Sequence, residues 1–401
     1  MRSLSLIALC LTVGLAGACA SSPSDGSLES GSSSGAGSGS GASSGSGSGS
    51  GGHGSSSGSG GGSGSSSGGG SGSGGGSGGS SGSSSSGGSS GGSSGGGSGG
   101  SSGGSSGGTG SSGGAVPTFG GCQIFPADNP WNTRIDDATK YPVDPNSSAY
   151  VASIGSGTHL HPDWGDWSTN HYGIPWQVVP AGQATVPVTF DYADESDPGP
   201  YPFPASALVE GGANSGGDMH VLVVEQGSCT LYETWSSTYV GPGWHAGSGA
   251  KFDLGSNALR PDGWTSADAA GLPVMPGLVK VKEVQAGAVS HAIRFTAAKS
   301  QNGYIHPATH QAGSSGASLP PMGLRMRLKA SFDLSGFKGP SLVILTAMKQ
   351  YGIILADNGS NWYISGDSDD AWTPLMDSIV SDFSKVTGAD FEAVITGTIQ
   401  H

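Results

Sequence analysis

Residues 217–235 read GDMHVLVVEQGSCTLYETW, and this stretch decides the fold. Two runs rich in Val, Leu and Tyr flank Gly227-Ser228, a favoured two-residue turn between antiparallel strands. Because side chains alternate along a strand, that turn places Leu222 opposite Glu233 and His220 opposite Trp235. The stretch therefore predicts a β-hairpin whose turn end and open end differ in chemistry.

The open end of this hairpin carries polar side chains on one face. In the predicted register the members of that polar group are Asp218, His220, Glu233 and Trp235. Nearer the turn the same face carries Leu222, Val224 and Leu231, a pattern typical of a core. A turn of three residues would instead move Glu233 to the opposite face, so the grouping depends on the turn.

Two carboxylates beside a histidine and an aromatic ring suit acid/base cleavage of a glycosidic bond. We expect Glu233 to be the proton donor and Asp218 to be the second carboxylate. Glu210, eight residues before Asp218 across a glycine-rich loop, is the reserve candidate. His220 and His245 would orient these carboxylates or the substrate.

Two other interpretations of the same residues stay open. Asp218, His220 and His245 form a possible metal-ligand set, because residues two apart on a strand share a face. The group can also be a buried, hydrogen-bonded cluster that ties loops together. The sequence lacks a tight His-x-His or Cys pair, so we expect no metal and no other cofactor.

Tryptophans beside Gly, Pro and Asp are candidates for sugar binding. The C–H face of a sugar ring stacks on an indole, while its hydroxyls bond to nearby polar groups. The expected substrate-binding residues are Trp164, Trp167, Trp176, Trp235 and Trp244.

Short β-branched or aromatic runs separated by Gly, Pro, Asp and Ser dominate the rest of the chain after residue 115. A second hairpin is expected over 279–296, and helices are expected over 341–352 and 373–388. The pattern predicts a mainly β domain, a β-sandwich or jelly-roll-like pair of sheets with a few helices packed on it.

The N-terminal region divides the chain. Residues 1–19 have one positive charge, an apolar run and small residues ending at Cys19, which predicts a lipoprotein-like signal peptide with lipidation at Cys19. Residues 20–114 are almost entirely Gly and Ser, and we expect them to be a disordered tether. The folded domain is expected over 115–401.

Two cysteines remain in that domain. In an oxidising compartment, Cys122 and Cys229 are expected to form one disulfide. The chain has a formal net charge of −14 at pH 7, so its field repels polyanions, and we expect no nucleic-acid partner. The only expected membrane contact is an N-terminal lipid anchor.

Several stretches resemble one family of secreted bacterial proteins of similar length. These stretches include FPADNPWNT (125–133), DYADESDPGPYP (191–202) and GWHAGSGA (243–250). The resemblance covers nearly all of the chain after the tether. It implies secretion and a single domain, and it carries no catalytic residue over to this chain.

Together these features predict a secreted or surface-tethered glycoside hydrolase. The expected substrate is an extracellular polysaccharide, a neutral β-glucan of a microbial cell wall, and the expected location is extracellular or at the cell outer membrane. A non-catalytic carbohydrate-binding or adhesion module is the alternative from another class. A metal-dependent hydrolase is the third hypothesis.

Overall fold

The computed structural model describes residues 116–213, 215–314 and 316–401. The expected signal peptide over 1–19, the lipidation site Cys19 and the tether over 20–114 lie outside these residues. All described residues belong to one compact unit. Within them, no helix has both the length and the apolar character needed to cross a bilayer.

The larger sheet has six strands in the order β15-β12-β13-β11-β14-β3. Its strands are β3 (His161–Asp163), β11 (Ile293–Ala297), β12 (Arg325–Leu328), β13 (Ile353–Asn358), β14 (Tyr363–Ser365) and β15 (Phe391–Val394). The sheet is mixed, because β11 runs parallel to β13 and β14 runs parallel to β3, while the other pairs are antiparallel.

The second sheet has four strands in the order β10-β7-β6-β4. They are β4 (Trp176–Val179), β6 (Val221–Glu225), β7 (Thr230–Trp235) and β10 (Ser248–Asp253). Strands β6 and β7 are the predicted hairpin, and Leu222 lies opposite Glu233 as the two-residue turn requires. The predicted register is therefore confirmed.

Two smaller sheets complete the β structure. One contains β5 (Val188–Phe190), β9 (Trp244–Ala246) and β8 (Thr238–Tyr239), and the other contains β1 (Thr118–Phe119) and β2 (Cys122–Gln123). No sheet in the described part of the chain closes on itself, and the architecture is mainly β and consistent with a β-sandwich. The expected fold class is confirmed.

The helices are short and few. The α-helices are α1 (Ser147–Ile154), α2 (Val281–Ala286), α3 (Gly339–Gln350) and α4 (Met376–Phe383). Single 3₁₀ turns are η1 (Ala193–Glu195), η2 (Met275–Gly277), η3 (Asp370–Trp372) and η4 (Gly388–Asp390). Helices α3 and α4 confirm the two helical predictions.

The second predicted hairpin is wrong in its first half, because α2 occupies that half. Val281 and Val284 are both buried, and their spacing of three places them on one helical face. Gly287 ends the helix with a left-handed φ of 88°, and its N–H bonds to the carbonyls of Glu283 and Val284. The alternating valines that suggested a strand are thus satisfied by helical packing.

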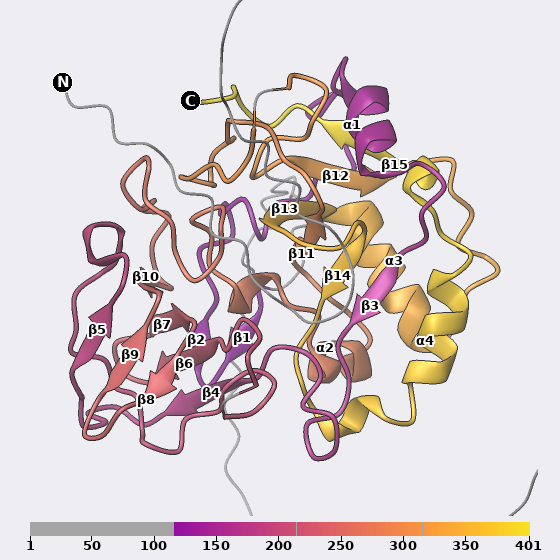
Figure 1. Cartoon of the computed structure of the whole chain (residues 1–401). Helices are drawn as coiled ribbons and strands as arrows, with labels where there is room; N and C mark the ends of the chain where they lie inside the picture. Colours follow the sequence, from indigo (N-terminus) through magenta and orange to yellow (C-terminus); the bar gives the residue numbers. More distant parts are fainter. Residues whose placement is uncertain (1–115, 214, 315) are drawn as a thin grey trace, which may run out of the picture. The chain divides into compact units, whose positions relative to one another are not determined.

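The four-stranded sheet is the middle layer between two apolar cores. One face, with Leu222, Val224 and Leu231, packs into the large core that also contains the six-stranded sheet. The other face, with Val221 and Val223, packs into a smaller core that it shares with the three-stranded sheet. Figure 1 shows the hairpin strands with β5, β8 and β9 on one side of the domain, and β11 to β14 with α3 and α4 on the other.

The predicted disulfide between Cys122 and Cys229 is confirmed. Its Cα atoms lie 5.4 Å apart, and the two cysteines are separated by 107 positions in the sequence. The bridge fastens β2 to the turn of the β6–β7 hairpin. The open end of the hairpin lies at the other end of β6 and β7.

Candidate functional site

The centre of the candidate site is His220, which directly precedes β6. Its side chain is buried and bonded through both ring nitrogens. Nδ1 lies 2.5 Å from Oε2 of Glu210, and Nε2 lies 2.9 Å from the carbonyl oxygen of Ala267. The backbone N–H of Glu210 also donates to the carbonyl of His220 at 3.0 Å, so the two residues are neighbours through main chain and side chain alike.

The chain between Glu210 and His220 must reverse sharply to bring them together. Gly211 and Gly212 both have left-handed φ values, 70° and 86°, which a residue with a Cβ rarely adopts. The glycine-rich stretch thus places the reserve carboxylate beside the histidine.

His220 is positively charged at neutral pH. Burial lowers the pKa of this imidazole, but the charge and hydrogen bond of Glu210 outweigh burial and raise the pKa to about 10. A protonated imidazole donates from both nitrogens, which matches its two acceptor partners. The site therefore has a buried cation beneath a carboxylate.

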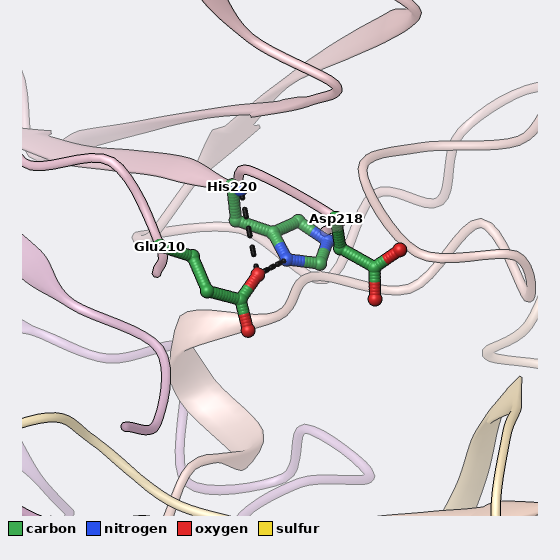
Figure 2. A group of neighbouring side chains, drawn as sticks. All are labelled: Glu210, Asp218 and His220. Atoms are coloured by element: carbon green, nitrogen blue, oxygen red, sulfur yellow. Dashed lines mark hydrogen bonds and ion pairs between the residues drawn. The ribbon is translucent and has the colours of Figure 1, made fainter. Parts of the chain in front are cut away.

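Asp218 is the exposed member of the group. One oxygen of Asp218, one of Glu210 and a ring nitrogen of His220 all lie within 4.8 Å of one another. Figure 2 shows the two carboxylates around the His220 ring. The indole Nε1 of Trp235, which is partly exposed, donates to Oδ1 of Asp218 at 3.2 Å. The open end of the hairpin thus brings together three of its four predicted polar residues, with Glu210 added.

Glu233 is fully buried and does not face an open groove, which corrects its expected role as proton donor. Its two oxygens accept hydrogen bonds from the backbone N–H groups of Val274 and Met275, each at 2.8 Å. Burial raises the pKa of Glu233 to about 7, and the two backbone bonds oppose that rise. The register was right, but residues 274–275 cover the carboxylate and make it an internal anchor.

His245 does not join the group, which corrects a second expectation. It lies in β9 of the three-stranded sheet, where Nδ1 is 3.0 Å from the hydroxyl of Thr189. Its Nε2 lies 3.2 Å from Asp191, and both side chains are well exposed. This histidine and carboxylate form a separate surface pair.

The five predicted sugar-binding tryptophans divide by exposure. Trp164 and Trp244 are buried, at 0% and 3% exposure, so neither offers a face to a ligand. Both are core residues, and their indole nitrogens have no hydrogen-bond partner. Trp167, Trp176 and Trp235 are partly exposed and remain candidates.

A second group of charged residues, here called the second wall, comes from the six-stranded sheet and escaped the sequence analysis. Arg294 in β11 is buried, and its Nε and Nη2 lie 3.2 and 3.0 Å from the two oxygens of Asp268. Its Nη1 donates to the hydroxyl of Ser365 at 2.7 Å, and its Nη2 lies 3.9 Å from Asp357. Glu210 is near enough for its charge to raise the pKa of Arg294, which connects the two walls.

Two carboxylates on this wall hold protons more tightly than usual. Burial, and then the charge of Asp268, raise the pKa of Asp357 well above its ordinary value, although 26% of its side chain remains exposed. Burial also raises the pKa of Asp163, at the end of β3, and the charge of Glu210 adds to the rise. Groups with shifted pKa values around a partly exposed site are typical of functional centres.

One sequence signal could have revealed this second wall. Arg294 is a single charged residue inside the apolar run AIRFT, and Asp357 follows the apolar run ILA. A charge at such a position requires a buried partner. The identity of that partner is set by tertiary contacts, so the sequence analysis had no means of grouping these residues.

A metal ion would have limited support in this arrangement. Among the described residues, the one group of three with suitable ligand spacing is Glu210, Asp218 and His220. Both ring nitrogens of His220 already face acceptor oxygens, those of Glu210 and Ala267, so the histidine acts as a donor rather than as a ligand. Only the two carboxylates would then be free to coordinate.

No protein-family model, no curated protein and no solved structure matches this chain. The chemistry of the site is therefore argued from its own geometry.

Proposed function

We propose that this chain is a secreted or surface-tethered glycoside hydrolase that cleaves a neutral glucan. The observation that carries the proposal is the Glu210–Asp218 pair, whose oxygens approach within 4.8 Å above the buried His220 cation. Retaining glycosidases use two carboxyl groups about 5–5.5 Å apart, and inverting enzymes use a wider gap of about 6.5–9.5 Å. An approach this close is compatible with the retaining reaction, which we adopt for the proposal.

In this reaction Asp218 is the acid and Glu210 is the nucleophile. The carboxyl of Asp218 protonates the glycosidic oxygen while the carboxylate of Glu210 attacks the anomeric carbon, which breaks the glycosidic bond and forms a glycosyl ester. Asp218 then removes a proton from water, and that water attacks the anomeric carbon and releases Glu210. In each cycle Asp218 gives its proton to the leaving group and regains one from the attacking water, and its exposure lets both reach it.

His220 positions the nucleophile in this scheme. Its bond to the carbonyl of Ala267 fixes the ring, and its positive charge lies 2.5 Å from the attacking carboxylate. Glu233, bonded to residues 274–275 behind the histidine, belongs to the scaffold. The proposal keeps the reaction class expected from the sequence, with Asp218 in the proton-donor role first given to Glu233 and Glu210 in the role first given to Asp218.

The nature of the substrate follows from charge and location. A net charge of −14 disfavours polyanionic polysaccharides such as pectin or alginate. The signal-like N-terminus ending at Cys19 and the Gly/Ser tether favour a location outside the cell, at the outer membrane or free in the medium. Glucan of another microbe's wall is a neutral polymer available there.

The test is a cleavage assay with a matched control. The full-length mature protein is incubated with β-1,3-, β-1,4- and β-1,6-glucans, and new reducing ends are measured. We expect Asp218→Asn and Glu210→Gln each to lower kcat about 10²–10⁴-fold, the range typical of acid/base groups. Asp191→Asn, which alters the exposed Asp191–His245 pair, should leave the rate unchanged.

Other outcomes would contradict the proposal in different ways. Binding of a glucan without reducing ends from any polymer would identify a carbohydrate-binding module. Loss of activity in EDTA with recovery on adding a divalent ion would identify a metal-dependent hydrolase. If Glu210→Gln lowers the melting temperature, the exposed Asp218→Asn variant still decides the assignment.

A further inference from the structure

Beside the carboxylate pair, the edge of the six-stranded sheet carries aromatic rings on one face. His161 and Asp163 are two apart on β3, so both side chains project from the same face. Tyr363 on β14 is the register partner of His161, and the two rings stack with centroids 4.0 Å apart. Ser365, the register partner of Asp163, receives the hydrogen bond from Arg294. This face therefore contacts the Arg294 side chain through Ser365.

Tyr172 extends the row of rings. Its hydroxyl lies 3.0 Å from Nε2 of His161 and is also hydrogen-bonded to Asp163. The side chain is 39% exposed, although a large aromatic residue with these partners is more often covered. An exposed ring fixed by two polar partners is a rigid surface at low entropic cost.

A second stack joins the row to the loop that holds Glu210. The rings of Trp167 and His171 are nearly parallel, at 11°, with centroids 4.4 Å apart. A Cβ on Gly212 would lie 2.6 Å from Cδ2 of His171, so this histidine packs directly against the Glu210 loop. Both rings are partly exposed.

We infer that these five rings form a row of sugar-binding subsites leading to Glu210 and Asp218. The row, here called the aromatic strip, consists of Tyr363, His161, Tyr172, His171 and Trp167. The inference deepens the proposed function and rests on it, because it names an extended glucan chain, and not a disaccharide, as the substrate.

The chemistry of the aromatic strip fits a neutral sugar chain. Rings of this kind stack on the C–H faces of pyranose units, and the adjacent carboxylates of Asp163 and Asp166 accept hydrogen bonds from hydroxyls. Asp166 is partly exposed in the loop that carries Trp167. A polyanion would meet these carboxylates and be repelled.

The experiment measures binding separately from cleavage. In the full-length Asp218→Asn protein, calorimetry gives Kd for β-1,3-, β-1,4- and β-1,6-linked glucohexaoses and for the matching disaccharides. We expect Trp167→Ala and Tyr172→Ala each to weaken binding of the preferred hexaose about fivefold to tenfold, as the loss of one aromatic contact should. Tyr172→Phe keeps the ring and should stay within about twofold to threefold of the parent. The disaccharide should be affected less.

The control is an exposed aromatic residue on another sheet. Tyr239 in β8 is 45% exposed, and Tyr239→Ala should leave hexaose binding unchanged. Melting temperatures of all variants verify that the fold is kept. If no glucohexaose binds, or if both alanine variants bind as tightly as the parent, the aromatic strip is not a sugar site.

The two proposals fail separately. If Trp167→Ala and Tyr172→Ala, made in the catalytically competent protein, cleave glucan with unchanged kcat/KM, the aromatic strip is not a substrate site, and the hydrolase proposal still stands. If hexaose binding depends on the aromatic strip but the wild type releases no reducing ends, the hydrolase proposal fails, and the sugar-binding proposal still stands.

Discussion

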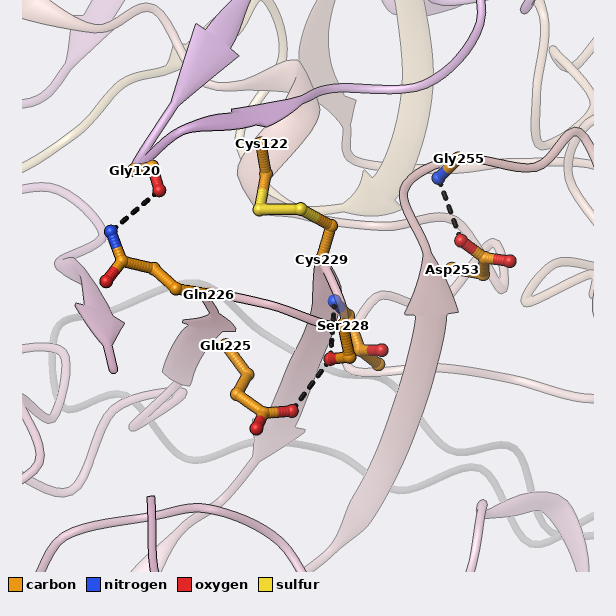
Figure 3. Close-up of a disulfide and its surroundings, with 9 residues drawn as sticks. Gly120, Cys122, Glu225, Gln226, Ser228, Cys229, Asp253 and Gly255 are labelled. Carbon is orange, nitrogen blue, oxygen red and sulfur yellow. Dashed lines mark hydrogen bonds between the residues drawn. A yellow bond between two sulfur atoms is a disulfide. The ribbon is translucent and has the colours of Figure 1, made fainter. Parts of the chain in front are cut away.

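The two ends of the β6–β7 hairpin have the same strand geometry but opposite surroundings. At the turn end, Cys229 is bridged to Cys122, and Gln226 Nε2 donates to the carbonyl of Gly120 at 2.8 Å (Figure 3). Polar side chains there are exposed to solvent. At the open end, Glu233 and His220 are buried, and both are hydrogen-bonded to backbone groups of residues 267–275.

This difference shows how one hairpin can be both framework and functional wall. The turn end is stabilised by a covalent link and by hydrogen bonds at the surface, so it can be exposed without loss of order. At the open end, the polar groups require partners from the rest of the fold, because a buried polar group without a partner is costly. The same contacts that satisfy them hold Glu210 and Asp218 in place.

The largest effect on stability is expected at the turn end. Replacing both Cys122 and Cys229 by Ser removes a bridge across 107 positions, which the loop-entropy model values at about 4–5 kcal/mol. The free energy of unfolding, measured by urea titration, should fall by that order. Reduction of the wild type should have the same effect. An unchanged unfolding midpoint would show that the turn is held without the bridge.

At the open end, Glu233 is expected to matter for stability and not for chemistry. In Glu233→Gln, one of the two backbone N–H groups that Glu233 now binds would face an amide NH₂, which cannot accept its hydrogen bond. The loss of that bond should lower the free energy of unfolding by about 1–3 kcal/mol. Glu225→Gln is the matched control at the turn end, where the exposed carboxylate accepts a 2.7 Å hydrogen bond from the hydroxyl of Ser228. This change should lower the free energy of unfolding by about 0.5 kcal/mol or less. Equal costs for both variants would contradict the contrast between the ends.

The open end is also expected to show a pH dependence of stability. The folded-state pKa of His220, about 10, lies above its ordinary value of 6.5, so between these pH values only the folded state keeps the proton. The stabilisation is fully present below pH 6.5 and is lost as the pH rises toward 10, by up to about 1.4 kcal/mol for each pH unit. Urea titrations from pH 7 to 9.5 should show this decline in the wild type and a flatter curve in Glu210→Gln. Parallel curves would mean that Glu210 is not the group that holds the proton.

Local patterns in the sequence were sufficient for the frame of the hairpin. Alternating side chains and a Gly-Ser turn predicted the pairing of Leu222 with Glu233, because strand period and turn length depend only on neighbouring residues. The disulfide followed from the cysteine count in an exported chain. The mainly β class followed from many short runs separated by turn residues.

What covers each polar side chain was decided only by the tertiary structure. Glu233 became an internal anchor because residues 274–275, some forty positions away, place two N–H groups over it. Glu210 stayed accessible because its glycine-rich loop lies at the surface of the fold. Arg294 and Asp357 joined the site from strands that pair in another sheet. Burial and long-range partners decide whether a carboxylate is structural or is available for chemistry. The spacing of nearby residues determines neither the burial nor the partners.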